Sequence, residues 1–149
     1  MRSTEPPELV LHIDGGSRGN PGPSGFGVHA IDRNGVVVAE HFGFIGVATN
    51  NVAEYRALVH AFKLAAARGA RSIEIRSDSE LVVKQMNGIY KVKHPDMIAL
   101  WREASTLRRR FESAEIKHVR REQNQEADAL ANRAMDLSDS HLSDQEFPR

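Results

Sequence analysis

Hydrophobic residues in the first third of the chain follow the short, alternating pattern of β-strands. Residues 9–13 form an apolar run rich in strand-forming residues, and this run gives way to a glycine-rich segment. Two further strand-like runs, 25–31 and 36–44, are separated by a turn whose Asn34-Gly35 pair is a strong hairpin signal. The pattern therefore predicts three consecutive antiparallel strands.

From residue 49 onward the apolar spacing changes to that of helices. Residues 53–65 repeat apolar side chains at every third or fourth position and predict the first long helix, with capping residues at 49–51 and a stop at Gly69. There follow a strand at 72–76, a helix at 80–86, an amphipathic helix at 95–111, a strand at 115–119 and a helix at 124–135. This order favours an α/β fold with a five-stranded mixed sheet, in which an antiparallel meander of the first three strands is joined by parallel fourth and fifth strands. Helices are expected on both faces of that sheet.

The length of the chain limits how many domains it can form. Its 149 residues, 40% of them hydrophobic, suffice for one buried core and are too few for two ordinary domains. We expect an N-terminal extension at 1–8, one domain at 9–135 and a flexible polar C-terminal tail at 136–149. Residues 1–7 lack an apolar signal core, and no apolar run reaches membrane-spanning length. The sequence therefore predicts a soluble cytoplasmic protein without membrane contact or an obligate protein partner, and a monomer by default.

Charge is balanced over the whole chain and uneven along it. Basic and acidic residues number 20 each, which argues against binding of a polyanion by bulk charge. Basic residues predominate between 84 and 121 and acidic residues from 122 onward, as expected if one region faces phosphate. The absence of cysteine excludes disulfides, thiolate metal sites and cysteine nucleophiles, and it is compatible with a reducing cytoplasm.

Four acidic residues stand out by their positions in the predicted elements. Asp14 ends the first strand, Glu54 lies in the first turn of the first long helix, Asp78 ends the fourth strand and Asp128 lies in the last helix. Small apolar neighbours place these acids near the core, where several carboxylates cannot all stay ionised without a cation. Oxygen-only ligands favour Mg²⁺ or Mn²⁺ over Zn²⁺. Two such ions about 4 Å apart activate water and stabilise the leaving oxygen in phosphodiester hydrolysis.

Four short motifs are more specific together than any one of them is alone. They are Ile13-Asp14-Gly15-Gly16-Ser17 with Gly19-Asn20-Pro21-Gly22, Thr49-Asn50-Asn51-Val52-Ala53-Glu54-Tyr55, Ser77-Asp78-Ser79, and Asn124-x-x-Ala127-Asp128-x-Leu130-Ala131. Their order and intervals resemble those of the type 1 ribonuclease H family over residues 9–135. The stretch 90–96 is most similar to compact bacterial and archaeal members, which include mycobacterial ribonuclease H domains.

The resemblance implies a ribonuclease H-like fold and endonucleolytic cleavage of the RNA strand of RNA/DNA hybrids. It implies two metal ions bound with substrate, 5′-phosphate and 3′-hydroxyl products, and a catalytic metal-binding set of Asp14, Glu54, Asp78 and Asp128. Other positions match family residues that contact substrate: Asn20, Asn50, Gly15 and Gly16 at the minor groove and RNA 2′-hydroxyls, and Thr49 at a phosphate of the DNA strand. Amide side chains both donate to and accept from a hydroxyl, in agreement with such contacts.

The sequence departs from the family pattern in two places. Many members carry a histidine in the loop before the last helix, whereas here we expect Arg121 to replace it and His118 to be a structural or surface residue of the last strand. An arginine binds phosphate and, because it stays protonated, does not act as a base. The basic protrusion of several members is also absent. Lys91 and Lys93 are predicted to replace it in part, which predicts weaker and more salt-sensitive binding of the hybrid.

Other functions remain open from the sequence. The glycine-rich segment 15–25 lacks both the Gly-Lys-Ser/Thr ending of a P-loop and the spacing of a dinucleotide fingerprint, so we interpret it as a strand connection. Another nuclease of the same superfold is one alternative, and a catalytically inactive module that binds RNA/DNA hybrids is a second. Double-stranded RNA as a further substrate and the choice between Mg²⁺ and Mn²⁺ are left undecided.

Overall fold

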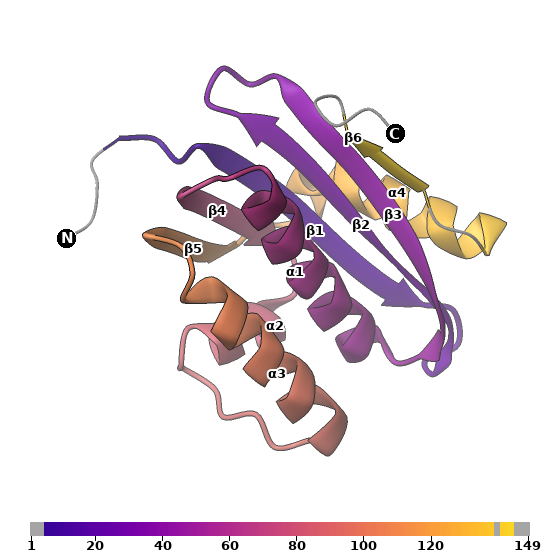
Figure 1. Ribbon diagram of the computed structural model, residues 1–149. Coiled ribbons are helices and arrows are strands. Elements are labelled where there is room, and N and C mark those ends of the chain that lie inside the picture. The colour runs from indigo at the N-terminus through magenta and orange to yellow at the C-terminus, as the bar shows by residue number, and fades with distance from the viewer. Residues whose placement is uncertain (1–4, 139–140, 145–149) are drawn as a thin grey trace.

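The computed structural model describes residues 5–138 and 141–144, and its centre is one mixed sheet. Strands β1 (Leu9–Ser17), β2 (Gly22–Asp32) and β3 (Val37–Ala48) form the antiparallel meander that the sequence predicts. Strand β4 (Ser72–Ser77) runs parallel to β1, and β5 (Ser113–His118) runs parallel to β4 (Figure 1). The predicted fold class is therefore confirmed.

Helices cover both faces of the sheet, as the sequence predicts. On one face, α1 (Asn50–Ala67) packs on β1 and β2, and α3 (Pro95–Arg108) packs on α1; α2 (Glu80–Met86) lies beside β5. On the other face, α4 (Gln125–Leu137) follows a single 3₁₀ turn, η1 (Arg121–Gln123), and lies across β1, β2 and β3 (Figure 1). No helix among the described residues has the length and apolar character needed to cross a membrane.

A sixth strand, β6 (His141–Asp144), corrects the prediction of a flexible tail at 136–149. It pairs antiparallel with β3 and completes the strand order β5-β4-β1-β2-β3-β6. A sheet edge presents unpaired backbone N–H and C=O groups, so a distant segment can become a strand without a strong local pattern. The last helix also extends to Leu137, and residues 139–140 and 145–149 of the predicted tail lie outside the described residues.

The described part of the predicted N-terminal extension is bonded to the domain. The backbone N–H of Glu8 donates to the Ser72 carbonyl at 2.9 Å, and the Glu8 side chain accepts from the Arg71 N–H at 3.1 Å. The Arg33 guanidinium donates to the Pro6 carbonyl at 2.9 Å. Residues 5–8 are therefore held at the start of β4 and at the β2–β3 turn, whereas residues 1–4 lie outside the described residues.

The element boundaries differ from the predictions where pairing between strands extends a local pattern. Strand β2 begins at Gly22 and β3 continues to Ala48 because these two residues pair across the meander. Helix α3 ends at Arg108 rather than at residue 111. Phe111 nevertheless packs on the core, since its ring lies 5.8 Å from that of Phe62. The apolar spacing that predicted this helix therefore includes Phe111, a core residue that lies beyond the end of α3.

Close packing of α4 on the sheet fixes the position of the last predicted acid. A Cβ atom on Gly27 would lie 2.6 Å from the Cβ atom of Leu130 and 2.8 Å from the backbone nitrogen of Ala131. The helix presents buried alanines to this surface at positions 127, 131 and 134. Glycine on the strand and alanine on the helix let the two backbones approach closely, and this approach brings Asp128 into the pocket that Asp14 of β1 lines.

Candidate metal centre and active site

Three of the four predicted acids converge at one edge of the sheet. One carboxylate oxygen from each of Asp14, Glu54 and Asp78 lies within 4.8 Å of the others. The parallel register pairs Ile13 of β1 with Ser77 of β4, so the acids that follow these residues lie side by side where this pairing stops. The prediction that Asp14 ends the first strand is wrong, because β1 continues to Ser17 through its pairing with β2. Parallel strands end at the same edge, which is where catalytic side chains gather in α/β sheets.

Glu54 joins this pair because α1 begins against β1. A Cβ atom on Gly15 would lie 2.5 Å from the Glu54 backbone nitrogen, so the close approach requires glycine at that position. Thr49 caps the helix, and its hydroxyl oxygen accepts a hydrogen bond from the Val52 N–H at 3.3 Å. The side chain of Glu54 is consequently buried, at 8% exposure, beside Asp14 at 9%.

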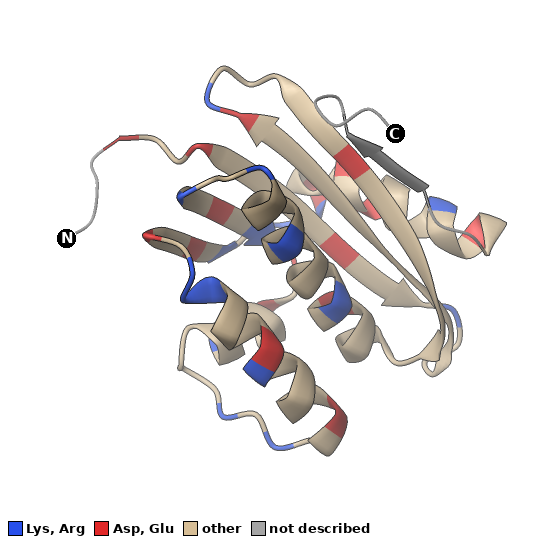
Figure 2. Ribbon diagram, in the orientation of Figure 1, with Lys and Arg blue, Asp and Glu red and all other residues tan. Residues whose placement is uncertain are grey.

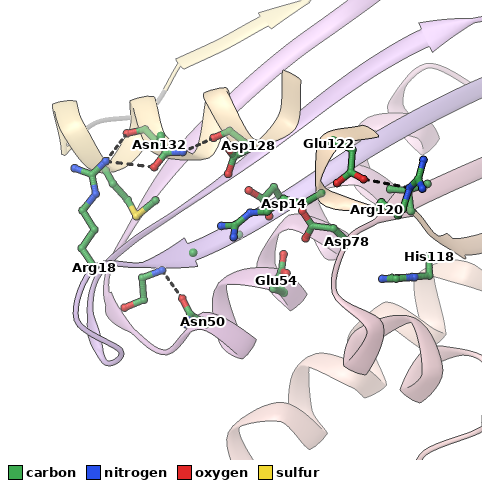
Figure 3. A pocket seen from close by; sticks show the side chains of 16 residues that line it. Asp14, Arg18, Asn50, Glu54, Asp78, His118, Arg120, Glu122, Asp128 and Asn132 are labelled. Carbon is green, nitrogen blue, oxygen red and sulfur yellow. Dashed lines mark hydrogen bonds and ion pairs between the residues drawn. The ribbon is translucent and has the colours of Figure 1, made fainter. Parts of the chain in front are cut away.

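Asp128 completes the set from the opposite face of the sheet. It lies on α4 and lines the same pocket as the other three acids, and its carboxylate is near enough to help raise the pKa of Asp14. Figure 3 shows Asp14, Glu54 and Asp78 directed toward a common centre, with Asp128 beside Asp14 on the neighbouring helix. The structure thus brings together all four acids that the sequence singled out, three in one cluster and the fourth at its edge.

Mutual repulsion and burial make this cluster electrostatically unfavourable without a cation. Burial, followed by the nearby Asp78 and Asp128 carboxylates, raises the pKa of Asp14 to about 8. Burial, followed by Asp14 and Asp78, raises the pKa of Glu54 well above its usual range. The Oε1 atom of Glu54 is buried and has no hydrogen-bond partner among the described residues. Adjacent carboxylates with an unsatisfied buried oxygen fit a hard divalent cation such as Mg²⁺ or Mn²⁺.

The acids lie in an open pocket of about 750 Å³ whose rim carries basic and neutral polar groups. Arg121 opens η1 and lines this pocket, and its charge partly offsets the rise in the pKa of Glu54. Arg120 lies on the same rim and forms an ion pair with Glu122 at 3.3 Å. The structure therefore places Arg121 beside the acids, as the replacement proposed for the loop histidine requires.

Sequence reasoning missed the contribution of His118 to this pocket. His118 is the last residue of β5, is exposed as predicted, and also lines the pocket (Figure 3). It pairs with Ser77, the residue immediately before Asp78. The signal was present in the strand order, because a residue that ends a neighbouring parallel strand reaches the same edge of the sheet.

Arg18 and Asn132 are further pocket residues that the sequence did not single out. The Arg18 guanidinium forms an ion pair with Asp136 at 2.5 Å and donates a hydrogen bond to the Asn132 side-chain oxygen at 3.4 Å. These contacts connect the β1–β2 loop to α4 across the end of the pocket (Figure 3). No local sequence pattern predicts them, since the two segments lie at opposite ends of the chain.

Two of the predicted minor-groove residues, Asn20 and Asn50, are hydrogen-bonded to each other at the rim of the pocket. Asn50 accepts a hydrogen bond from the Ser17 N–H through its Oδ1 atom at 2.7 Å, and the Asn50 N–H donates to Asn20 Oδ1 at 3.0 Å. Asn50, Gly15 and Gly16 line the acid-containing pocket. Thr49 lies next to this rim, in a neighbouring pocket of about 500 Å³ at the start of α3. The start of α1 and the β1–β2 loop therefore form one continuous surface.

Lys91 and Lys93 lie away from the acids, on the linker between α2 and α3. Both lysines are exposed, and Figure 2 shows basic positions along this linker. Lys91, Tyr90 and Trp101 line a separate pocket of about 500 Å³. The ammonium group of Lys84 lies 5.0 Å from the centre of the Tyr90 ring and donates to its hydroxyl at 3.3 Å. Any contact of this linker with substrate is therefore separate from the acid-containing pocket.

Comparison with known proteins finds ribonuclease H relatives and one matching family model over most of the chain. The Reverse transcriptase-like family model matches residues 12–134. Ribonuclease HI of Halobacterium salinarum is 46% identical over 125 residues, which cover 84% of this chain and 63% of the relative. Ribonuclease H of Chromohalobacter salexigens is 35% identical over 144 residues, which cover 87% of this chain and 85% of the relative.

Longer relatives and solved structures agree with this match. The bifunctional protein Rv2228c of Mycobacterium tuberculosis is 47% identical over 133 residues, which cover 88% of this chain; the chain spans only 36% of that protein's length. The solved N-terminal RNase H domain of Rv2228c has a TM-score of 0.86 at 45% identity and covers 89% of this chain, with 96% of that structure matched. LC11-RNase H1 in complex with an RNA/DNA hybrid has a TM-score of 0.83 at 39% identity, covering 87% of this chain and 98% of that structure. With its motifs, its sheet order and its acid cluster in agreement, this chain belongs to the type 1 ribonuclease H family.

Proposed function

We propose that this protein is an endonuclease that hydrolyses the RNA strand of RNA/DNA hybrids with the help of divalent metal ions. The observation that carries the proposal is the cluster of Asp14, Glu54 and Asp78, built from the motif positions of the family at the floor of an open pocket. Family membership supports hydrolysis of RNA, and the LC11-RNase H1 complex supports an RNA/DNA hybrid as the substrate. The products expected are 5′-phosphate and 3′-hydroxyl ends.

Asp14, Glu54, Asp78 and Asp128 are the residues that would hold the metal. Two ions of Mg²⁺ or Mn²⁺, bound together with substrate, would supply an activated water and stabilise the leaving oxygen. The orphaned Oε1 atom of Glu54 and the raised pKa of Asp14 both support this assignment, since a cation relieves each of them. Asp128 is half-buried at the edge of the cluster, where it faces both the metal centre and the open pocket.

Residues of the acid-containing pocket and of the surface next to it bind and orient the hybrid. Asn50 and Asn20, with the backbone of Gly15 and Gly16, present amide groups that recognise the RNA 2′-hydroxyl, which DNA lacks. Thr49 lies beside them and binds a phosphate of the DNA strand. Arg121 binds a phosphate near the cleaved bond and keeps its charge throughout.

Lys91 and Lys93 act at longer range. They lie on an exposed linker outside the acid-containing pocket, so they would contact phosphates several nucleotides from the cleaved bond. Such contacts add affinity that depends strongly on salt and carries no sequence preference.

The test is cleavage of an end-labelled RNA/DNA hybrid in Mg²⁺, Mn²⁺ or EDTA. Single-stranded RNA and an RNA/RNA duplex serve as substrate controls, and Asp14→Asn is compared with Glu112→Gln, an exposed acid distant from the cluster. Internal cuts in the RNA strand that require metal and disappear only in Asp14→Asn would support the proposal. Cleavage of the RNA/RNA duplex would add that substrate.

The competing function is a catalytically inactive module that binds hybrids. Retained binding of the hybrid without cleavage in either metal would favour that function over the nuclease. The four acids together count against it, because loss of even one would have been sufficient to abolish metal-dependent hydrolysis.

A further inference from the structure

Asn124 is a fully buried polar residue that the proposed function does not yet use. It stands between η1 and α4 at 0% exposure. Its Nδ2 atom donates to the Ile13 carbonyl of β1 at 2.8 Å. Its backbone N–H donates to the Arg121 carbonyl at 3.0 Å, and its own carbonyl accepts from the Asp128 N–H at 3.1 Å.

These three hydrogen bonds connect Asn124 to the backbone at or next to three site residues. Ile13 is the residue immediately before Asp14, so the side-chain bond fixes the strand where that acid begins. The two backbone bonds fix Arg121 on one side and Asp128 on the other. The relative positions of two acids and the arginine on the rim therefore depend on where this single amide holds the start of α4.

The side chain of Asn124 is used differently from that of an ordinary helix cap. An asparagine at the start of a helix usually accepts a hydrogen bond from a backbone N–H of the first turn, which stabilises the helix. Here the side chain makes no capping bond and reaches to β1 instead. Its Oδ1 atom is buried without a hydrogen-bond partner among the described residues. A buried acceptor without a partner destabilises the folded protein, so this position gives up local stability to keep a donor directed at β1.

We propose that Asn124 is a positioning residue that sets the distance between Asp14 and Asp128 and the orientation of Arg121. This inference rests on the proposed function and assigns to Asn124 an effect on metal affinity and turnover rather than on hybrid affinity. Metal centres tolerate little displacement of their ligands, and loss of a group that orients a ligand typically lowers affinity or activity by about 10–100-fold.

The test compares Asn124→Ala and Asn124→Ser with Gln85→Ala. Gln85 is a matched control, because it is a buried amide at 5% exposure that accepts a hydrogen bond from the Tyr55 hydroxyl at 2.7 Å and does not line the acid-containing pocket. For each variant we would measure the melting temperature in EDTA, Mn²⁺ binding by calorimetry without substrate, and kcat and KM for a hybrid. All assays would be run at the same temperature interval below each melting temperature.

In both Asn124 variants we expect about 10-fold weaker Mn²⁺ binding and a kcat lowered by about 10–100-fold, with KM changed by less than about threefold. Gln85→Ala should lose melting temperature to a similar extent while Mn²⁺ binding and kcat stay close to wild type. Wild-type metal affinity and kcat in a folded Asn124→Ala variant would overturn the inference. So would unfolding of both Asn124 variants, since the contact would then serve general stability.

Mn²⁺ binding measured without substrate tests the role of Asn124 independently of the nuclease activity. A wild-type protein that binds Mn²⁺ and does not cleave hybrids would refute the nuclease proposal. The calorimetric comparison of wild type with Asn124→Ala would still decide whether Asn124 positions the acids.

Discussion

Replacing Asp14 by asparagine should stabilise the metal-free protein while abolishing its proposed activity. Burial and two neighbouring carboxylates raise the pKa of Asp14 from 3.8 to about 8. A carboxyl with a raised folded-state pKa binds its proton more tightly in the folded protein than in the unfolded chain. The contribution of Asp14 to the free energy of unfolding is therefore most favourable at low pH and is lost as pH rises from about 4 to about 8. Asparagine has nearly the same shape and carries no charge, so the variant does not lose unfolding free energy in this way as the pH rises.

The size of the effect follows from the same shift. The free energy lost is about 1.4 kcal/mol for each pH unit between the ordinary pKa of 3.8 and the working pH. At pH 7 the stabilisation by Asp14→Asn therefore has an upper limit of about 4 kcal/mol. The open pocket admits water and the neighbouring acids relax, so we expect about 1–3 kcal/mol at pH 7. For a domain of this size that corresponds to a rise in melting temperature of roughly 3–10 °C.

Thermal unfolding in EDTA at pH 5, 6, 7 and 8 measures this prediction. The difference between Asp14→Asn and wild type should be small at pH 5 and grow toward pH 8, whereas Glu112→Gln should show no such trend. Saturating Mn²⁺ should stabilise wild type and have a smaller effect on Asp14→Asn, which reduces or reverses the difference. An Asp14→Asn protein that melts at or below the wild-type temperature at pH 8 in EDTA would refute the electrostatic reasoning.

Three further perturbations test other parts of the structure. Arg121→Ala should lower kcat by about 10–100-fold, and Arg121→Lys should recover part of it if the role of Arg121 is charge alone. An equal kcat in wild type and both variants would show that Arg121 has no role in the site. Gly27→Val should lower the unfolding free energy by about 2–4 kcal/mol, because the larger side chain would push α4 away from β2. The control Gly35→Asn, in an open turn with φ of 80°, should lower it by less than about 1 kcal/mol. Chemical denaturation measures both values. Burial, followed by His41 and Lys63, lowers the pKa of His60 to about 4, so unfolding free energy should fall by up to about 3 kcal/mol between pH 6.5 and 4. A His60→Leu variant with an unchanged pH profile would contradict that assignment.

Much of the fold could be predicted because its determinants are local. The Asn34-Gly35 turn is encoded within a few residues: Gly35 has a positive φ, and Asp32 Oδ1 accepts from the Asn34 and Val36 N–H groups at 2.9 and 3.0 Å. The helix Glu80–Met86 begins after the Ser79 cap as predicted, since cap and apolar pattern lie within one segment. The four acids were identifiable because local patterns locate them: Asp78 directly follows β4, Asp14 follows the apolar run of β1, and Glu54 and Asp128 lie near the starts of their helices.

Tertiary structure decided what those acids do to one another and which other residues join them. The pairing of Ile13 with Ser77 places Asp14 beside Asp78, and the burial that raises the pKa of Glu54 follows from α1 packing on Gly15. Hydrophobic spacing specifies which face of an element is buried and does not specify its partner or the register between distant strands. For that reason the sequence by itself determined the elements and the candidate acids. The strand β6, the pocket positions of His118 and Arg18, and the separation of Lys91 and Lys93 from the acids depend on contacts between segments far apart in the chain.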